Sequence, residues 1–391
     1  MAKNTELSAV TPFTVEIPES QLADLKTRLD HVRWPDELPG VGWAYGMPLG
    51  YARELTAYWR DSYDWHAAER ALNQVPQFTT TIDGQNIHFI HVRSAEANAL
   101  PLLLVHGWPG SFLEFLDLIG PLTDPRAHGG DPADAFDVVI PSIPGFGFSG
   151  PTTERGWNHE RTSRAFLELM TRLGYERFGT QGGDIGAQIG PMMGKIAPER
   201  VIGIHVNAAS VGFIPMGPVE GAGLDALTDR EKTSVKKIAE FTTDGFGYSQ
   251  IQSTRPQTLA YGLTDSPVGQ MVWITEKFKD WTAGDGLPEE SIPRDRLLTN
   301  VTLYWLTKTA NSSARNYYET SHSNDFGLLS APGTVPTAVA NFSEDVAIRR
   351  FAARTNRIVR WNEFDKGGHF AAMEVPDLLV SDVQAFFSEL R

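Results

Sequence analysis

The sequence predicts an α/β protein in which helices cover both faces of a mostly parallel sheet. Short strand-like runs of apolar residues alternate with helical stretches, which is the pattern of such a sheet. A long helical and aromatic segment without clear strands divides this alternation, which then returns near the C-terminus. An insertion of this kind usually forms a lid over the carboxyl ends of the strands, where ligands bind. We therefore expect a binding site between the sheet and the lid.

The composition is that of a globular protein large enough for about two or three structural units. The chain has 391 residues, of which 41% are hydrophobic, and its 34 Lys and Arg against 48 Asp and Glu give a net charge of −14. This charge disfavours nucleic acid as a partner. The sequence has no cysteine, which excludes disulfides, thiolate metal sites and a cysteine nucleophile. No signal peptide or membrane span is evident, so we expect a cytoplasmic location without a membrane anchor.

The first part of the chain predicts a helical N-terminal region and the beginning of the sheet. Residues 13–75 have leucines at helical spacing and four tryptophans, which need a surface to bury against. Residues 77–82 and 86–92 flank an Asp-Gly pair, which is the pattern of a hairpin with a tight turn. We assign residues 1–90 to this N-terminal unit.

The rest of the chain divides into two parts of a core and an inserted lid. Residues 91–212 form the first part of the core, residues 213–325 the helical lid, and residues 326–391 the second part of the core. The core strands are expected at residues 102–105, 136–140, 177–181, 201–206, 337–341 and 358–364, with helices at 161–173 and about 376–390.

The most informative motif is Gly-Gly-Asp-Ile-Gly at residues 182–186, between a strand-like run and a helical one. It matches the small-x-nucleophile-x-small pattern of a nucleophile elbow, with Asp184 where serine usually stands. Glycines are needed because the turn is sharp and neighbouring elements crowd it. An aspartate that caps a helix after a glycine-rich turn gives the same pattern, so the motif alone leaves both interpretations open.

A second motif, His-Gly-Trp-Pro-Gly at residues 106–110, follows the first long apolar strand. In hydrolases with a nucleophile elbow, the oxyanion hole combines the amide after the nucleophile with an amide from this early loop. The donors here are predicted to be the backbone N–H groups of Trp108 and Ile185. Glycine and proline also punctuate ordinary loops, but the position directly after the strand favours the catalytic interpretation.

A histidine and an acid complete the expected catalytic set. His369 lies in Gly-Gly-His-Phe after the last expected strand, and the general base of such enzymes comes last along the chain. Glu344 and Asp345 follow the strand-like residues 337–341, where an acid that orients the histidine would fit. Because the two acids are adjacent, spacing does not choose between them, and an exposed acidic turn explains at least one of them.

An aspartate nucleophile predicts a particular reaction. A carboxylate with a pKa near ~4 needs no base for activation, and its attack on saturated carbon forms an alkyl ester. The histidine then activates water, which hydrolyses the ester. The substrates with a suitable electrophilic carbon are epoxides and alkyl halides. An epoxide also needs a proton donor for its oxygen, and tyrosine suits this task because it is neutral at pH 7.

The motifs resemble those of the microsomal-type epoxide hydrolases of the α/β-hydrolase superfamily, and the resemblance covers nearly the whole chain. It implies an α/β-hydrolase fold with a helical lid and a helical N-terminal extension. The matching segments are the region from about 11 to 120, Trp-Pro-Gly at 108–110, Pro-Gly-Phe-Gly-Phe-Ser at 144–149, the elbow at 182–186, Gly-Tyr-Ser-Gln-Ile-Gln at 247–252, Ser-Ser-Ala-Arg-Asn-Tyr at 312–317 and Gly-Gly-His-Phe at 367–370.

The resemblance also selects two lid tyrosines. It implies that Tyr248 and Tyr317 donate to the epoxide oxygen, because they stand in the two family segments that bear these residues. Tyr261, Tyr304 and Tyr318 lie in the same lid, and position along the chain does not distinguish them from the selected pair.

For the acid, the resemblance implies Asp345, which stands three residues after Phe342 as in the family. Ser343 replaces the proline that usually follows this phenylalanine, so this assignment departs from the family pattern. Glu344 is then expected to be a solvated neighbour.

The activity that the resemblance implies is hydrolysis of a small-molecule epoxide to a vicinal diol, without a cofactor or a metal ion. Family roles range from detoxification to bacterial natural-product biosynthesis, including enediynes. The sequence does not give the natural substrate, and it leaves a homo-oligomer open.

Three other interpretations fit the sequence less well. A haloalkane dehalogenase shares the aspartate nucleophile, but such enzymes typically place tryptophan directly after it, where Ile185 stands. An esterase is disfavoured because the elbow lacks serine. A non-catalytic binding protein with this fold would be expected to lose the aspartate, the histidine or the oxyanion loop, and all three are present.

Overall fold

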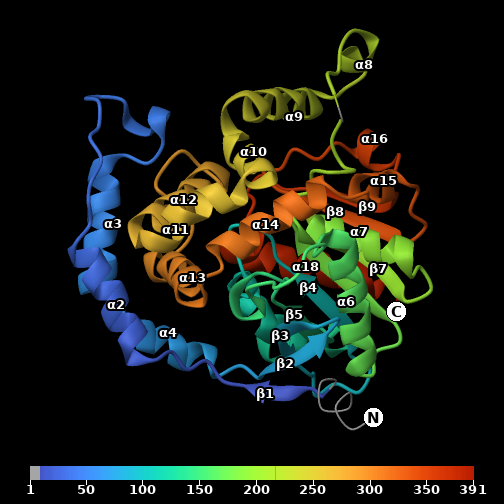
Figure 1. The fold of residues 1–391 in the computed structure, drawn as a ribbon. Coiled ribbons are helices and arrows are strands. Elements are labelled where there is room, and N and C mark those ends of the chain that lie inside the picture. The colour runs from blue at the N-terminus through green and yellow to red at the C-terminus, as the bar shows by residue number, and fades with distance from the viewer. Residues whose placement is uncertain (1–8, 216) are drawn as a thin grey trace.

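A single sheet lies at the centre of the computed structural model, which describes residues 9–215 and 217–391 (Figure 1). Within these residues the strand order is β1-β2-β3-β5-β4-β6-β7-β8-β9. The pairs β1–β2, β2–β3 and β3–β5 are antiparallel. The other five pairs, β5–β4, β4–β6, β6–β7, β7–β8 and β8–β9, are parallel, which confirms the predicted mostly parallel sheet. The strands are β1 (Thr11–Phe13), β2 (Gln77–Ile82), β3 (Gln85–Val92), β4 (Leu100–Val105), β5 (Phe136–Pro141), β6 (Phe178–Gly183), β7 (Val201–Asn207), β8 (Pro336–Asn341) and β9 (Arg357–Glu363).

Helices cover both faces of the sheet. Gly179 of β6 lies against Phe387 of α18, whereas the next residue, Thr180, lies against Gly190 of α7. Because successive strand residues point to opposite faces, α7 and α18 cover opposite sides. Helix α6 packs with α7, and α5 packs with α18. These helices are α5 (Leu116–Thr123), α6 (His159–Arg172), α7 (Gly186–Ile196) and α18 (Pro376–Ser388), with short helices α16 (Arg349–Ala352) and α17 (Ala371–Glu374) nearby in the chain.

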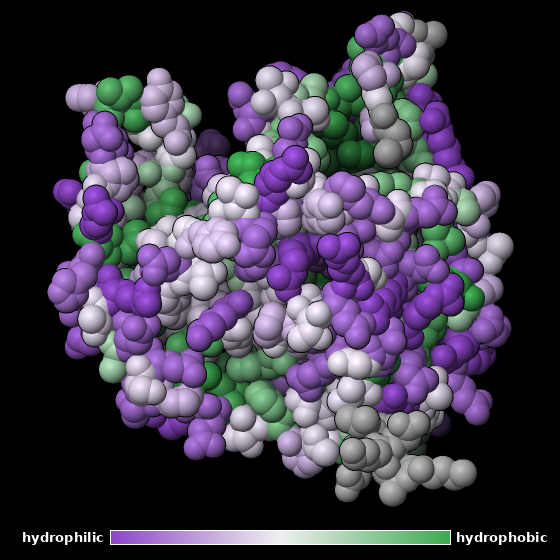
Figure 2. Space-filling model, in the orientation of Figure 1, coloured by the Kyte–Doolittle hydropathy of each residue, from purple (hydrophilic) through white to green (hydrophobic). Residues whose placement is uncertain are grey.

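The lid lies between β7 and β8 in the chain, and the regular elements among its described residues are helices joined by loops, as the sequence predicts. Helices α8 and α9 project at the top of Figure 1, and we call residues 222–240 the lid arm. In Figure 2 the N-terminal region rises at the top left and the lid arm at the top right, and the surface is hollowed between them. The lid helices are α8 (Ala222–Asp225), α9 (Asp229–Glu240), α10 (Gly247–Thr254), α11 (Pro256–Asp265), α12 (Pro267–Trp281), α13 (Arg294–Thr307), α14 (Ala310–Ser321) and α15 (Asp325–Ser330).

The N-terminal helices α2 (Glu19–Asp30), α3 (Leu49–Asp61) and α4 (Trp65–Leu72) run along the lid at the left of Figure 1. Trp59 and Trp65 of these helices are buried, as expected for tryptophans that pack against the main body of the protein. The hydroxyl of Tyr51 donates to Glu289 at 2.8 Å, and that of Tyr58 donates to Asp295 at 2.8 Å. The N-terminal region is thus fastened to the lid by polar contacts as well as by apolar packing.

The hairpin expected at the Asp-Gly pair joins β2 to β3. Asp83 and Gly84 both have positive φ values, 50° and 76°, as a two-residue turn of this kind requires. Short 3₁₀ helices occur at Gly42–Tyr45, Phe112–Phe115, Pro125–His128, Pro132–Asp134, Gly147–Ser149 and Pro288–Glu290, and a π-helical turn at Phe241–Gly245. Within residues 9–215 and 217–391, none of the helices is both long enough and apolar enough to cross a membrane.

Candidate active site

The turn between β6 and α7 places Asp184 above the carboxyl edge of the sheet. Asp184 has φ 54°, a left-handed conformation that is strained for a residue with a side chain. A Cβ atom on Gly182 would lie 2.6 Å from the carbonyl oxygen of Val105, and one on Gly186 only 2.0 Å from it. The two glycines are therefore required because β4 runs so close to the turn. This is the geometry of an elbow rather than of an ordinary helix cap.

The early loop after β4 meets the elbow at the aspartate side chain. The backbone N–H of Trp108 donates to Oδ1 of Asp184 at 2.9 Å. A Cβ atom on Gly107 would lie 2.3 Å from the same Oδ1, so glycine permits this close approach. Ile185 directly precedes α7, and the first amides of a helix have no acceptor within it. The structure thus brings the Trp108 amide to the carboxyl group of Asp184, while Ile185 stands next to Asp184 in the chain, at the start of α7.

The predicted histidine faces the other oxygen of this carboxylate. Nε2 of His369 lies 3.9 Å from Oδ2 of Asp184, which is too long for a direct hydrogen bond. Burial lowers the pKa of His369, and the nearby charge of Asp184 opposes this effect. The backbone N–H of His369 donates to the carbonyl oxygen of Trp281 at 2.9 Å, which ties the histidine loop to the end of α12.

Asp345 is buried at the end of β8, with 8% of its surface exposed. Its Oδ2 accepts hydrogen bonds from the backbone N–H groups of Ala208 and Phe342, each at 3.1 Å. Burial raises the pKa of Asp345 to about 6, although these two hydrogen bonds favour the charged form. Among the hydrogen bonds and ion pairs of the described chain, none joins Asp345 to His369 directly.

Glu344 has a different environment from its neighbour. Its side chain is 38% exposed and forms an ion pair of 2.7 Å with Nζ of Lys237 on the lid arm. The expectation of a merely solvated carboxylate was therefore incomplete, because Glu344 is part of a contact between the lid and the core.

The two tyrosines that the family resemblance selects lie together above Trp108. The ring of Tyr248 stacks on the Trp108 ring with a centroid distance of 5.0 Å, and the ring of Tyr317 meets Trp108 edge-on at 6.0 Å. The centroids of the two tyrosines are 6.0 Å apart. Burial, and after it the charge of Asp184, raises the pKa of Tyr248, and burial also raises that of Tyr317. Both hydroxyls are therefore protonated at neutral pH.

The remaining lid tyrosines have other surroundings. Tyr261 is 73% exposed and Tyr318 is 37% exposed. Tyr304 is buried, but its hydroxyl donates to the backbone carbonyl of Gly110 at 2.7 Å. This comparison favours Tyr248 and Tyr317 as the pair that faces the elbow.

Together these groups form a carboxylate with an amide donor on one oxygen, a neutral histidine near the other, and two neutral phenols above. Such a set can attack an electrophilic carbon, protonate the oxygen that leaves it and activate water. Within the described part of the chain, no cluster of three or more His, Cys, Asp or Glu residues is arranged to hold a metal ion.

Comparisons with known proteins identify the family of this chain. Residues 10–115 match the family described as epoxide hydrolase N terminus, and residues 101–230 match the alpha/beta hydrolase fold. A Stigmatella aurantiaca protein, provisionally named an epoxide hydrolase, is 45% identical over 98% of this chain and 86% of its own length. Epoxide hydrolase 1 of Sus scrofa is 36% identical over 99% of this chain and 90% of its own length. The chain belongs to the epoxide hydrolases.

A solved structure supports the same conclusion for the whole fold. The juvenile hormone epoxide hydrolase of the silkworm Bombyx mori superposes with a TM-score of 0.90 at 32% identity, over 98% of this chain and 95% of that one. The enzyme is therefore an α/β hydrolase that acts on epoxides.

Two residues of this epoxide hydrolase site were not predicted from the sequence. The Trp281 ring lies between the site's tyrosine and histidine, with centroids 5.4 Å from Tyr248 and 4.8 Å from His369. Glu374 accepts from the backbone N–H groups of Ala283 at 2.8 Å and Phe370 at 3.0 Å, and burial raises its pKa to about 7. Trp281 is one of ten tryptophans and has no distinguishing pattern, whereas Glu374 follows the histidine motif closely.

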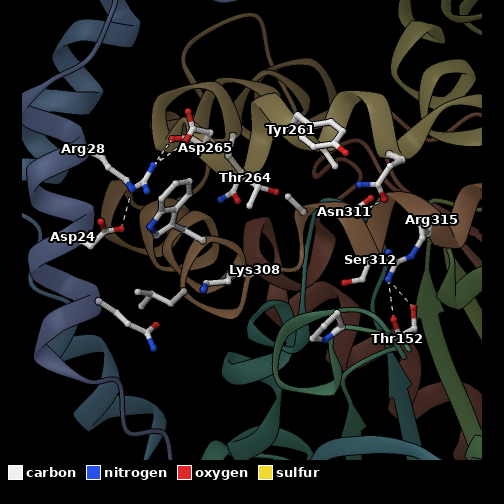
Figure 3. Close-up of a pocket in the computed structure, with 18 of the residues that line it drawn as sticks. Asp24, Arg28, Thr152, Tyr261, Thr264, Asp265, Lys308, Asn311, Ser312 and Arg315 are labelled. Carbon is white, nitrogen blue, oxygen red and sulfur yellow. Dashed lines mark hydrogen bonds and ion pairs between the residues drawn. The ribbon is translucent and has the colours of Figure 1, made fainter. Parts of the chain in front are cut away.

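The enzyme also has a separate cavity of about 1120 Å³ between α2 and the lid (Figure 3). Its lining includes Lys308, Asn311 and the ion pair of Arg28 with Asp265, and it contains none of the predicted catalytic residues. The chemistry described above therefore belongs to the elbow, not to this cavity.

Proposed function

We propose that this epoxide hydrolase opens its substrate through a covalent alkyl ester on Asp184. The observation that carries the proposal is the placement of the Asp184 carboxylate between the Trp108 amide, the tyrosine pair and His369. The product is a vicinal diol.

In the first step, Oδ2 of Asp184 attacks a carbon of the epoxide. Oδ1 accepts the hydrogen bond from Trp108, which leaves Oδ2 as the attacking atom. As the new C–O bond forms, the epoxide C–O bond breaks, and the epoxide oxygen takes a proton from Tyr248 or Tyr317. Burial holds both phenols in the protonated form that this step needs. The step therefore needs no base.

In the second step, His369 takes a proton from water, and the resulting hydroxide attacks the carbonyl carbon of the ester. The separation of 3.9 Å between His369 and Asp184 is one that a bridging water can span. The negative charge that develops on Oδ1 is stabilised by the backbone N–H groups of Trp108 and Ile185. The bond between the ester carbonyl carbon and Oδ2 then breaks, and the leaving alkoxide takes the proton held by His369. The tyrosinate left by the first step takes the proton of the new Asp184 carboxyl group, so the aspartate, the histidine and the tyrosine are all regenerated.

Asp345 is proposed to stabilise the positively charged form of His369. Its support is its burial at the end of β8 and its link to the elbow through Ala208. The Ala208 N–H donates to Asp345, and the Ala208 carbonyl accepts from the N–H of Asp184 at 3.3 Å. An ionised carboxylate in this place favours protonation of the imidazole during the second step.

We further propose a small-molecule epoxide as the substrate, a cytoplasmic location, and a role in either detoxification or bacterial natural-product biosynthesis. The chain supplies each catalytic group from its own residues, so we propose no cofactor. A model epoxide such as styrene oxide is suitable for testing the chemistry before the natural substrate is known.

The covalent mechanism is tested by single turnover in ¹⁸O-water with the enzyme in excess over styrene oxide. The label is expected in the Asp184 carboxylate, because water attacks the ester carbonyl and the diol carries the old carboxylate oxygen. An Asp184→Asn variant and a sample without substrate serve as controls. Label in the diol on the first turnover, with none on Asp184, would falsify the proposal.

A further inference from the structure

The lid arm contacts the loop that carries Asp345 through Arg230, in the first turn of α9. Nη2 of Arg230 donates to the backbone carbonyl of Asn341 at 3.0 Å, of Phe342 at 3.2 Å and of Phe364 at 3.3 Å. Asn341 ends β8 and Phe364 directly follows β9. One guanidinium therefore holds together the carboxyl ends of two neighbouring strands, and the chain after them carries the acid and the histidine.

A second cation of the same helix contacts the same loop. Nζ of Lys237 donates to the carbonyl of Ser343 at 3.3 Å and to Glu344 at 2.7 Å. The start of α9 is fixed by a capping box, in which Thr228 and Glu231 bond to each other's backbone N–H groups. This box defines the first helical turn, from which the Arg230 side chain reaches the strand ends.

Arg230 contacts the residue that fixes the conformation of the acid. The Phe342 carbonyl accepts from Arg230 and also from the N–H of Asp345 at 3.1 Å, while the Phe342 N–H donates to the Asp345 carboxylate. The acid is thus bonded to both backbone polar groups of Phe342, and Arg230 bonds to one of them. Moving the guanidinium would displace the turn that presents the carboxylate.

We propose that Arg230 is a positioning residue that holds the Asp345 loop from the lid arm and supplies a positive charge opposite the acid. The inference rests on the proposed role of Asp345 in ester hydrolysis. It follows that the second step of the reaction depends on the seating of the lid arm, whereas the first step does not.

The charges around Asp345 come from several elements. Arg230 on α9 is the cation, Glu344 lies on the same loop as Asp345, and Glu374 lies on α17. Arg230 also lies 3.7 Å from the Glu363 carboxylate on β9 and 3.8 Å from that of Asp365. Burial raises the pKa of Asp345, and the Arg230 charge opposes this rise. Without that charge the acid would protonate at a higher pH, and the rate of ester hydrolysis would fall earlier as the pH is lowered. Because the Arg230 side chain is 31% exposed, solvent screening keeps the shift at the low end of the range for such pairs.

The test compares Arg230→Met and Arg230→Lys with the wild type in single-turnover experiments with styrene oxide. Formation and hydrolysis of the alkyl-enzyme are measured separately across the pH range. Lys236→Met is the matched control, because Lys236 lies on the same helix, is 77% exposed and contacts Glu240 instead of the loop. Asp345→Asn is measured in parallel.

For Arg230→Met, the acidic limb of ester hydrolysis is expected to move up by about one pH unit, with alkylation unchanged. Arg230→Lys should restore most of the limb, and Lys236→Met should match the wild type. The proposal is overturned if Arg230→Met keeps the wild-type limb, or if it slows both steps equally at every pH. If Asp345→Asn hydrolyses the ester normally, the acid assignment itself fails, whereas a slow Asp345→Asn with a normal Arg230→Met refutes the Arg230 inference alone.

Discussion

The backbone N–H of Trp108 donates a hydrogen bond of 2.9 Å to Oδ1 of Asp184. This contact divides the roles of the two carboxylate oxygens before any substrate binds. In the proposed mechanism, the oxygen held by the amide is the one that carries negative charge during ester hydrolysis, so the donor needs no reorganisation at that stage. The other oxygen stays available for attack and faces His369.

Removal of the tyrosine hydroxyls should slow formation of the alkyl-enzyme. Tyr248→Phe and Tyr317→Phe are each expected to cost about 2–4 kcal/mol in the barrier to alkylation, by analogy with the loss of one oxyanion-hole donor. Rapid-quench measurement of alkyl-enzyme formation checks this, with Tyr261→Phe as the control because Tyr261 is 73% exposed. A double variant that alkylates at the wild-type rate would refute the assignment.

Replacement of His369 should stop the reaction after the first step. Asp184 is expected to attack without a base, whereas the ester cannot be hydrolysed without a group that takes a proton from water. His369→Gln mixed with excess styrene oxide should therefore gain the mass of the substrate and keep it, on the peptide that contains Asp184. Intact-protein mass spectrometry measures the adduct, and the same variant with Asp184→Asn should show none. Absence of an adduct in His369→Gln itself would mean that the histidine acts before covalent attack.

The two adjacent acids should respond differently to amide substitution. Asp345→Asn is expected to slow ester hydrolysis strongly, because the imidazolium loses its partner, and Glu344→Gln should change it little. Glu344 instead pairs with Lys237, and in Glu344→Gln the lid arm keeps the bonds of Lys237 to the Ser343 carbonyl and of Arg230 to the Phe342 carbonyl. Single-turnover rates of ester hydrolysis separate the two, and the opposite result would move the role to Glu344.

A buried network at the edge of the sheet should stabilise the fold above acidic pH. Asp382 on α18 accepts from His205 at 3.0 Å and from Arg360 at 2.8 Å, and its side chain is 2% exposed. Burial opposes its ionisation, but these hydrogen bonds and charges outweigh burial and lower its pKa to about 2. Because this pKa is below the unfolded value of ~3.9, the stabilisation is present above that value and is lost as the pH falls towards 2.

Asp382→Asn is therefore expected to reduce the free energy of unfolding by about 3 kcal/mol at pH 7, since it leaves the network without its anion. Urea denaturation measures the change, and the difference from the wild type should shrink between about pH 4 and pH 2. Asp377→Asn is the control, because Asp377 is exposed on the same helix. Equal stability of Asp382→Asn and the wild type at pH 7 would contradict the prediction.

The sequence predicts those features that depend on neighbours along the chain. The hairpin turn is predicted by Asp83 and Gly84. The elbow is predicted by Gly182 and Gly186, which the structure requires because a Cβ atom at either position would clash with the carbonyl oxygen of Val105. The alternation of strands and helices predicts the parallel part of the sheet, because βαβ units impose that order.

Other features depend on contacts between distant segments, which spacing does not reveal. Arg230 reaches carbonyl groups more than one hundred residues later in the chain, and Trp281 meets His369 across the boundary between lid and core. The choice of Tyr248 over Tyr261 needed a family resemblance, because both are lid tyrosines and differ in burial rather than in pattern.

The attachment of the N-terminal helices to the lid has a consequence for the passage of molecules. Tyr51 and Tyr58 bind one side of the lid to α3, while Arg230 and Lys237 bind the lid arm to the sheet. Because the lid is bonded to the rest of the protein at two separate places, it cannot move away as a rigid unit without breaking both sets of bonds. Entry of the epoxide and departure of the diol therefore have to use local openings between side chains. We therefore expect the width of those openings to limit which epoxides reach Asp184.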